Sequence, residues 1–475
     1  MKSRALAESI VVAVVLALSV SSATAFATPA ATVFVTNSHD SGPGSFRDAI
    51  DKANAHPAIT RIQLLGRVST IELQQTVWFT GPQNLTISGN GATLDGTDAG
   101  GPAFLATGGG NLAVFNLTVR NAPAEGISVD VPHYATGTIQ VLLFNVDVID
   151  NLGHGVLVDD QDDPATALLD GDSDASVNVS VVSTRFVGNG FSVTDRDGLR
   201  VNEGGNGDLI ITVLLSLARD NGADGIEVDE RGSGDVRVDM LGSQVNGNGQ
   251  FDPADLDDGF DIDENDDGSI VGIVFLSTAN DNYEEGFDFN ENHAGDLRVD
   301  MRQVEAHGNG EEGIDYEEDD DFAGGGDLVT TMVHVRANGN GTTGGGDSGL
   351  KIREKGEGNL DATLSRVETS NNLIGGISIR EDAIGSLVSS VTRASSLANT
   401  GHGIDFDENR TNANDLSSDL SATVTRSNSS HNGGAGVRAD QQTPGIGSLL
   451  LERVTLDANT GGATTGNNVI VTIVP

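Results

Sequence analysis

Three short stretches decide the fold of this chain: GFDID at 259–263, GFDFN at 286–290 and GIDYE at 313–317. In each stretch the first and third residues after the glycine are apolar, and the second and fourth are polar. Apolar side chains at every second position indicate a β-strand with one buried face. The stretches begin 27 residues apart, so the same strand returns at a fixed period.

The same pattern recurs on both sides of these stretches, and five of the ten intervals between its glycines are 27 residues. The other intervals read as 27 residues plus an insertion. A second alternating segment follows about ten residues after each glycine-led strand, as at 236–240 and 297–301. The other copies begin at Gly126, Gly155, Gly198, Gly225, Gly349, Gly376, Gly403 and Gly436.

Asparagine stands four residues before the glycine in seven of the eleven units. Asparagine tolerates left-handed backbone, and its amide can hydrogen-bond to a copy of itself above and below. We therefore expect a stacked ladder at a tight turn, made by Asn151, Asn221, Asn282, Asn309, Asn372, Asn399 and Asn432.

Two or three short strands in every 27 residues must pair with their own copies in the next unit, which predicts an all-β parallel solenoid. At about 4.8 Å between neighbouring strands, about thirteen coils give a rod of roughly 60 Å. A β-propeller is the alternative, but its units are longer, about 40 residues. A leucine-rich repeat lacks its leucine pattern here.

The ends of the solenoid expose unpaired strand edges, which must be covered. Residues 1–27 have a basic start, an apolar run and small-residue cleavage sites, which is typical of a secretory signal peptide, with a membrane anchor as the alternative. Residues 28–80 are expected to form an N-terminal cap, with a strand at 32–36 and a helix after Ser45 that presents Phe46, Ala49, Ile50 and Ala53. Residues 81–475 then form the β-helix.

The composition excludes several classes of protein. The chain has 70 Asp and Glu against 26 Lys and Arg, a net charge of -44, and no cysteine. This charge argues against nucleic acid and anionic membranes as partners. The absence of cysteine excludes disulfide scaffolds, thiol catalysis and cysteine-ligated zinc.

Residues 35–50, VTNSHDSGPGSFRDAI, resemble the N-terminal cap of secreted bacterial right-handed β-helix proteins, and 85–96, LTISGNGATLDG, resembles the coil that follows it. The resemblance, with the repeats, extends over nearly the whole chain after residue 27. It implies a right-handed parallel β-helix of the pectin-lyase-like superfamily, with a short N-terminal capping helix. That superfamily includes polysaccharide lyases, glycoside hydrolases, epimerases and adhesins, so the resemblance does not choose among activities.

No complete catalytic motif of that superfamily is present, and the catalytic residues stay unknown. Two Gly-His-Gly triplets, around His154 and His402, are interpreted as ordinary repeat turns, because the Arg-Ile-Lys of polygalacturonase-type enzymes is missing. Asp130, His133 and Tyr134 partly resemble an epimerase-type cluster, without its last aspartate. Lys351, Arg353 and Arg380 are candidate bases for an elimination reaction.

The acidic residues are concentrated, with 31 carboxylates and four arginines between Asp224 and Asp321. The alternation predicts two outward columns, one of Glu227, Asp261, Asp288 and Asp315, and one of Asp229, Asp263, Asn290 and Glu317. Stacked carboxylates repel one another, and Ca²⁺ is the cation that oxygen ligands favour. Asp263, Asn265 and Asp267 also match the opening of a calcium loop, although the acidic twelfth residue of an EF-hand is absent. We therefore predict Ca²⁺ as the cofactor, with a solvated acidic surface as the alternative. The predicted ligands are Asp261, Asp263, Asn265, Asp267, Asp288, Asp315 and Glu317.

Together these patterns predict a secreted or cell-surface β-helix with a structural, adhesive or glycan-binding role, whose partner is a polysaccharide or another surface protein. The alternative is a calcium-dependent polysaccharide lyase, hydrolase or epimerase of the same superfamily. Nucleic-acid binding is not expected, nor is a membrane span after removal of the signal peptide.

Overall fold

A computed structural model describes residues 31–161, 172–192, 194–251, 257–318, 325–382, 384–409, 419–442 and 445–475. The predicted signal peptide at 1–27 lies outside these ranges. Four long repeat intervals contain the segments 162–171, 252–256, 319–324 and 410–418, which also lie outside them. The strands on either side of each segment stay in register, so every insertion falls between strands.

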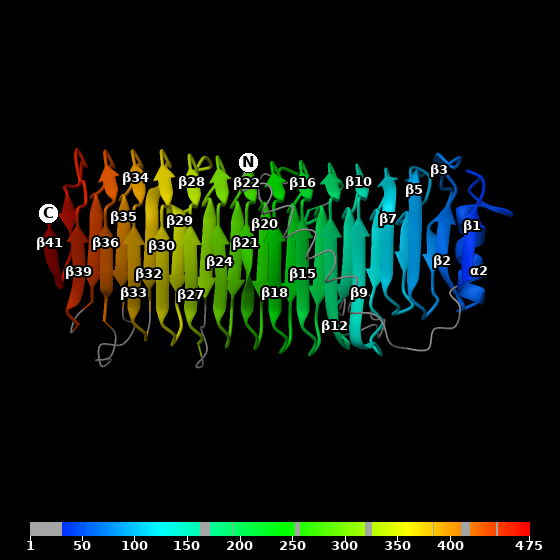
Figure 1. The fold of residues 1–475 in the computed structure, drawn as a ribbon, viewed down its shortest axis with the longest axis horizontal. Helices are drawn as coiled ribbons and strands as arrows, with labels where there is room; N and C mark the ends of the chain where they lie inside the picture. Colours follow the sequence, from blue (N-terminus) through cyan, green and yellow to red (C-terminus); the bar gives the residue numbers. More distant parts are fainter. Residues whose placement is uncertain are drawn as a thin grey trace, which may run out of the picture.

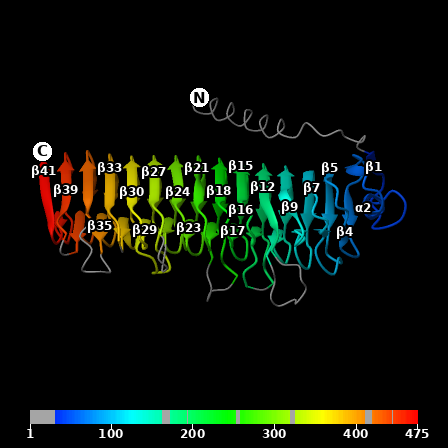
Figure 2. The same ribbon diagram turned by 90° about the horizontal axis from the view of Figure 1, so that it is seen from below.

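The chain is a right-handed parallel β-helix, in which successive coils stack along one axis (Figure 1). Figure 2 shows the long strands on one side of the rod and the glycine-led strands on the other. The eleven glycine-led strands and three further strands, β4, β6 and β40, form a 14-stranded parallel sheet, in good agreement with about thirteen predicted coils. Its strands are β4 (Val77–Phe79), β6 (Phe104–Ala106), β8 (Ile127–Asp130), β11 (Val156–Asp160), β14 (Leu199–Glu203), β17 (Ile226–Glu230), β20 (Phe260–Glu264), β23 (Phe287–Glu291), β26 (Ile314–Glu318), β29 (Ser348–Glu354), β32 (Gly375–Glu381), β35 (Ile404–Glu408), β38 (Val437–Gln441) and β40 (Thr464–Thr465).

The second sheet has 27 strands, because each coil adds a long strand and most add a short one after a bend. The long strands are β1 (Ala31–Val35), β2 (Ile59–Leu64), β5 (Leu85–Asp95), β7 (Leu112–Arg120), β9 (Thr136–Phe144), β12 (Asp174–Val182), β15 (Leu209–Leu214), β18 (Val236–Leu241), β21 (Ile270–Phe275), β24 (Leu297–Arg302), β27 (Leu328–Val333), β30 (Leu360–Ser365), β33 (Leu387–Thr392), β36 (Ser421–Thr425), β39 (Gly447–Glu452) and β41 (Val469–Val474). The short strands are β3 (Thr70–Glu72), β10 (Asp147–Ile149), β13 (Arg185–Val187), β16 (Leu217–Arg219), β19 (Gln244–Asn246), β22 (Thr278–Asn280), β25 (Glu305–His307), β28 (Arg336–Asn338), β31 (Glu368–Ser370), β34 (Ser395–Leu397) and β37 (Asn428–Ser430).

The core is a continuous apolar column, because each coil places the same positions inside. Phe260, Phe287 and Ile314 are paired across three successive strands, and all three side chains are fully buried. Phe289 stacks on Tyr316 with ring centroids 5.0 Å apart. The predicted alternation therefore sets the core, and burial of this apolar surface is the main force that holds the coils together.

The asparagine ladder is confirmed and is longer than predicted. Each asparagine donates both its Nδ2–H and its backbone N–H to the Oδ1 of the asparagine in the next coil. The left-handed residue of the turn precedes the asparagine, as at Asp220 and Asp281. The "four before glycine" rule missed members in coils where an insertion separates asparagine from glycine. The full ladder is Asn151, Asn189, Asn221, Asn248, Asn282, Asn309, Asn340, Asn372, Asn399, Asn432 and Asn459.

The predicted capping helix is present as α2 (Phe46–Ala55). The Ser45 side chain accepts the backbone N–H of Asp48 and forms the N-cap. All four residues of the predicted apolar stripe are buried, so the helix covers the open end of the core. Among the described residues, no helix is long and apolar enough to cross a bilayer.

Candidate metal centre

The two predicted acidic columns are confirmed by the strand register. Glu227, Asp261, Asp288 and Asp315 are direct neighbours across β17, β20, β23 and β26. Asp263 and Glu317 lie in the second column with Asn290 between them. Since neighbouring strands are about 4.8 Å apart, each carboxylate of the first column has another one rung away.

A third acidic row lies beside the first column, and the sequence analysis did not identify it. In five successive coils the residue directly before the repeat glycine is acidic, which is a signal visible in the sequence: Asp197, Asp224, Asp258, Glu285 and Glu312. Several of these side chains accept a backbone N–H from the next coil. Asp224 Oδ1 accepts from the N–H of Asp258 at 2.5 Å, and Asp258 Oδ1 accepts from that of Glu285 at 2.6 Å.

The two neighbouring rows bring carboxylate oxygens within 4.8 Å of one another in five groups of three. Four of these groups combine a residue before the glycine with a member of the first column. The groups are Asp195, Asp197 and Glu227; Asp224, Glu227 and Asp261; Asp258, Asp261 and Asp288; Asp258, Glu284 and Glu285; and Glu285, Glu312 and Asp315.

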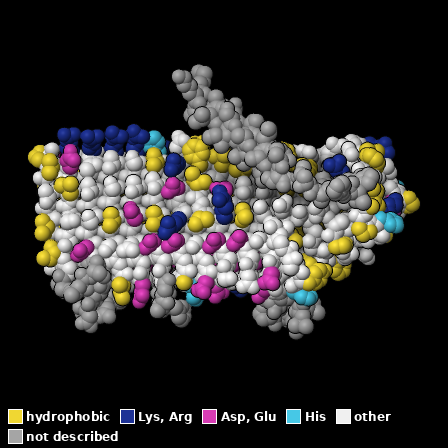
Figure 3. All heavy atoms as spheres, turned by 60° about the horizontal axis from the view of Figure 1, so that its bottom comes forward, with side chains coloured by type: hydrophobic (Ala, Val, Ile, Leu, Met, Phe, Trp, Pro, Cys, Tyr) yellow, Lys and Arg dark blue, Asp and Glu magenta, His cyan; other side chains and the backbone are white. Residues whose placement is uncertain are grey.

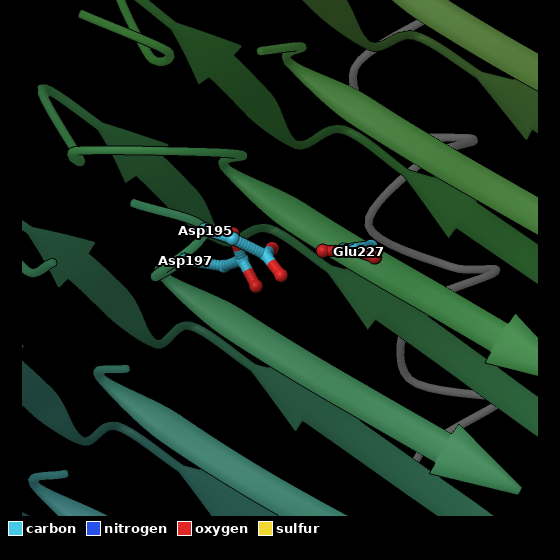
Figure 4. A group of neighbouring side chains, drawn as sticks. All are labelled: Asp195, Asp197 and Glu227. Carbon is cyan, nitrogen blue, oxygen red and sulfur yellow. The ribbon is translucent and has the colours of Figure 1, made fainter. Parts of the chain in front are cut away.

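Cations of the protein itself close both ends of this series. At one end, Arg200 Nη1 lies 2.6 Å from Asp195 Oδ1 and 2.6 Å from Glu227 Oε2. This arginine already neutralises the group of Asp195, Asp197 and Glu227 shown in Figure 4. At the other end, Lys351 Nζ lies 2.6 Å from Asp315 Oδ2 and 2.9 Å from Glu317 Oε2.

The described residues supply no such counterion for the middle of the series. Among the described residues, no Lys or Arg nitrogen lies within 4.0 Å of a carboxylate of Asp224, Asp258, Asp261 or Asp288. Asp261 Oδ1 and Asp288 Oδ1 are buried atoms without a hydrogen-bond partner. Buried carboxylate oxygens that lack a proton donor and a counterion are suited to a hard cation such as Ca²⁺.

The electrostatics agree with this arrangement. Burial raises the pKa of Asp261 and of Asp288 well above the usual range, and neighbouring carboxylates raise it further. Burial, again with neighbouring carboxylates, raises the pKa of Asp258 and of Asp263 to about 6. A bound divalent cation would reverse these shifts, because it favours the charged form of each ligand.

The remaining predicted ligands, Asp263, Asn265, Asp267 and Glu317, belong to none of the five groups. Asn265 donates through Nδ2 to Asp229 Oδ1 at 2.8 Å, and its own Oδ1 accepts from Asn292 Nδ2 at 3.0 Å. Asp267 is exposed in the turn after β20. Glu317 is near Lys351, Lys355 and Arg353, so the protein's own cations surround it.

A separate row of buried carboxyls lies inside the coil, at the last residue of the glycine-led strands. The period-two alternation places these residues on the inward face of each strand, where the sequence pattern predicted only apolar side chains. Burial and the neighbouring carboxyl raise the pKa of Glu203 to about 9 and that of Glu354 to about 11. These side chains accept backbone N–H groups of the following turn, as Glu354 Oε1 does from Gly356 and Gly358. We call this set the inner glutamate row: Glu203, Glu230, Glu264, Glu291, Glu318, Glu354, Glu381 and Glu408, all fully buried.

The histidines behave as the sequence predicted. His154 Nδ1 accepts the backbone N–H of Asp197 at 3.0 Å, and His402 Nδ1 accepts that of Ala435 at 2.9 Å. Both Gly-His-Gly triplets are therefore turns of the repeat. His133 and Tyr134 lie in an exposed loop with their rings edge to face, 5.3 Å apart, and neither belongs to a carboxylate group.

Comparisons with known proteins find similarity only at the level of backbone structure. No family model and no curated protein sequence matches the chain. Among solved structures, the pectate lyase Pel9A is 14% identical with a TM-score of 0.39, and the match covers 73% of this chain and 79% of that one. The periplasmic alginate epimerase AlgG is 13% identical with a TM-score of 0.42, covering 87% and 89%. The Streptococcus pneumoniae surface protein and adhesin PfbA is 10% identical with a TM-score of 0.20, covering 94% and 100%.

The strand order and register of the chain itself show the parallel β-helix. At these identities the likeness concerns the course of the chain, and it assigns no activity.

Proposed function

We propose that this protein is an exported β-helix that binds Ca²⁺ along its acidic face and has a structural, adhesive or glycan-binding role outside the cell. The observation that carries the proposal is the central part of the acidic series. There, the group of Asp258, Asp261 and Asp288 has no counterion among the described residues, while Arg200 contacts Glu227 at one end of the series and Lys351 contacts Asp315 at the other.

Calcium would act here as a structural cation. Carboxylates one rung apart repel by roughly 3 kcal/mol at an effective dielectric of 20. A divalent ion held between two coils would replace that repulsion by attraction and would clamp the coils together. The same ion could bridge the acidic rod to a carboxylate-bearing polysaccharide, which the rod alone would repel.

Calorimetric titration with calcium chloride tests the proposal. The wild-type chain should bind Ca²⁺, and the double variant D261N/D288N should lose at least tenfold in affinity, because it removes two ligands of the central group. The control D98N/D361N changes the same charge at two exposed aspartates that belong to no group. An equal loss in the control, or no calcium binding by the wild type, would reject the site.

A second candidate function is calcium-dependent polysaccharide elimination, and one contact favours it. Lys351 lies beside the group of Glu285, Glu312 and Asp315, so a potential base adjoins a potential metal site. However, its acidic neighbours outweigh burial and raise the pKa of Lys351, which keeps the amine protonated at neutral pH and suits a countercharge better than a base.

An ultraviolet assay for unsaturated products, with polygalacturonate and alginate in the presence of calcium, separates the two functions. We expect no turnover. Turnover that disappears in Lys351→Met, with the fold retained, would establish the enzymatic function instead.

A further inference from the structure

A row of basic side chains runs along one edge of the C-terminal half of the rod (Figure 3). Its members occupy the first position after five consecutive long strands: His334, Arg366, Arg393, Arg426 and Arg453. We call this set the basic row. All five side chains are exposed, and the rungs that carry them are about 4.8 Å apart.

The backbone at this position is unfavourable for such residues. The φ angles of Arg366, Arg393, Arg426 and Arg453 lie between 51° and 58°, in the left-handed region that bulky side chains seldom adopt. Other coils place Asn145 or Gly242 at the same position, and these residue types tolerate positive φ. The position also carries Leu215, Leu276 and Gln303, so it accepts several long side chains. Because the position accepts several residue types, the choice of arginine in four consecutive coils points to a function for these side chains.

Among the described residues, three of the four arginines of the row lack the carboxylate partners that balance arginine elsewhere in this protein. Arg438, for example, contacts Asp405 at 2.7 Å and Asp407 at 3.0 Å. In the described part of the chain, by contrast, no carboxylate lies within 4.0 Å of the guanidinium of Arg366, Arg393 or Arg426. Arg453 Nε lies 3.7 Å from Glu452 Oε1, and Arg366 Nη1 lies 2.8 Å from His334 Nε2 within the row. Parallel guanidinium groups one rung apart repel one another, so the row is costly unless an external anion neutralises it.

A groove of about 510 Å³ runs beside the row, and its two walls carry different kinds of side chain. His334, Arg366 and Arg393 line one side. Glu305, Arg336 and Glu368 line the other, where Arg336 contacts Glu305 at 2.6 Å and Glu368 at 3.4 Å. The groove therefore offers guanidinium donors on one side and carboxylate acceptors on the other.

We infer that the basic row and this groove bind a linear sulfated or phosphorylated glycan. Its anionic groups would lie along the arginines, while its sugar hydroxyls would donate to Glu305 and Glu368. A tetrahedral oxyanion has three acceptor oxygens, so one group can bridge two guanidinium forks on neighbouring rungs, which a carboxylate does less well. Charges of the acidic face beyond about 8 Å are screened at physiological ionic strength.

This binding site is separate from the calcium groups, and the test keeps the two apart. Affinity is measured by fluorescence anisotropy in EDTA, at about 150 mM salt, so that calcium cannot bridge the acidic face to the polymer. The probes are dextran sulfate, a phosphorylated mannan, polygalacturonate and neutral dextran. Calcium titration of the acidic face is read independently, and failure of one result leaves the other standing.

The decisive variant is R366N/R393N/R426N, because asparagine tolerates the left-handed backbone. It should bind the sulfated or phosphorylated probe at least tenfold more weakly, and its melting temperature should be unchanged or higher. The control R185Q/R219Q/R237Q removes the same charge from exposed strand positions elsewhere and should change affinity less than twofold. A third variant, R366K/R393K/R426K, keeps the charge without the fork and should fall between them.

The inference is supported if the wild type binds the sulfated or the phosphorylated glycan and only the asparagine variant loses this binding. The probe that binds then shows whether the ligand carries sulfate or phosphate esters. Three results overturn the inference: no binding by the wild type in EDTA, an equal loss in the control, or equal affinity for polygalacturonate or neutral dextran.

Discussion

Replacing the buried Glu354 by glutamine should make the protein less sensitive to alkaline pH. Glu354 belongs to the inner glutamate row, and burial followed by its interactions with Glu318 and Glu381 raises its pKa from 4.5 to about 11. The folded protein therefore holds a proton on this carboxyl at neutral pH, whereas the unfolded chain releases it. A raised pKa gives stability that is complete below pH 4.5 and is lost as the pH rises toward 11.

The size of the expected loss of stability follows from the pKa shift of Glu354. Each pH unit between the two pKa values costs about 1.36 kcal/mol, so this one group removes up to about 4 kcal/mol between pH 5 and pH 8. In Glu354→Gln the amide oxygen can still accept the N–H groups of Gly356 and Gly358. Gln441 already occupies the equivalent position in β38, where its Oε1 accepts the N–H of Leu420 at 2.7 Å.

Urea unfolding at about pH 5 and about pH 8 measures the difference. The wild type should lose more stability between the two conditions than Glu354→Gln, by about 1 to 4 kcal/mol. The value is a range because the protons are distributed over Glu354 and the neighbouring carboxyls. The control is Glu357→Gln, which alters an exposed glutamate in the same turn and should follow the wild type. If Glu354→Gln loses as much stability as the wild type between these conditions, the protonated inner row is refuted.

Further predictions concern calcium, the ladder and the basic row. Millimolar calcium should raise the melting temperature more than sodium chloride of equal ionic strength does, and equal effects would contradict specific sites. Calcium affinity should be greater at about pH 7.5 than at about pH 5.5 in titration calorimetry, because protons compete for Asp258 of the central group, whose pKa is about 6. Asn309→Ala should lower the free energy of unfolding by about 3 kcal/mol, since it leaves buried partners in two neighbouring coils unsatisfied, whereas exposed Asn206→Ala should cost under about 1 kcal/mol. Arg393→Asn should raise the free energy of unfolding by about 1 kcal/mol by relieving a positive φ, and a loss in thermal unfolding would contradict this.

The architecture could be predicted from the sequence because the same strand and turn pattern occurs in eleven units. Alternation after Gly259, Gly286 and Gly313 defined the strand and its inward face, and the structure keeps that register. The N-cap at Ser45 was equally local, since an N-cap depends on contacts within one turn of helix.

The acidic site was predicted only in part. The column of Asp261, Asp288 and Asp315 followed from period-two geometry. Its pairing with Asp224 and Asp258 did not, because those residues precede the glycine and the bend of the coil decides which way they face. For the same reason Asn265 and Asp267, which are close in sequence to Asp263, lie apart from the groups in space.

The sequence by itself determined the repeat, the strand alternation, the cap and the excess of negative charge, since all four depend on residues near one another in the chain. The tertiary structure alone decided which charges are neutralised. Stacking places Arg200 against Glu227 and Lys351 against Asp315, and it aligns four arginines on a separate edge. It leaves Asp258, Asp261 and Asp288 without a cation from the described part of the chain. Distances between coils set these interactions, and spacing along the chain does not reveal them.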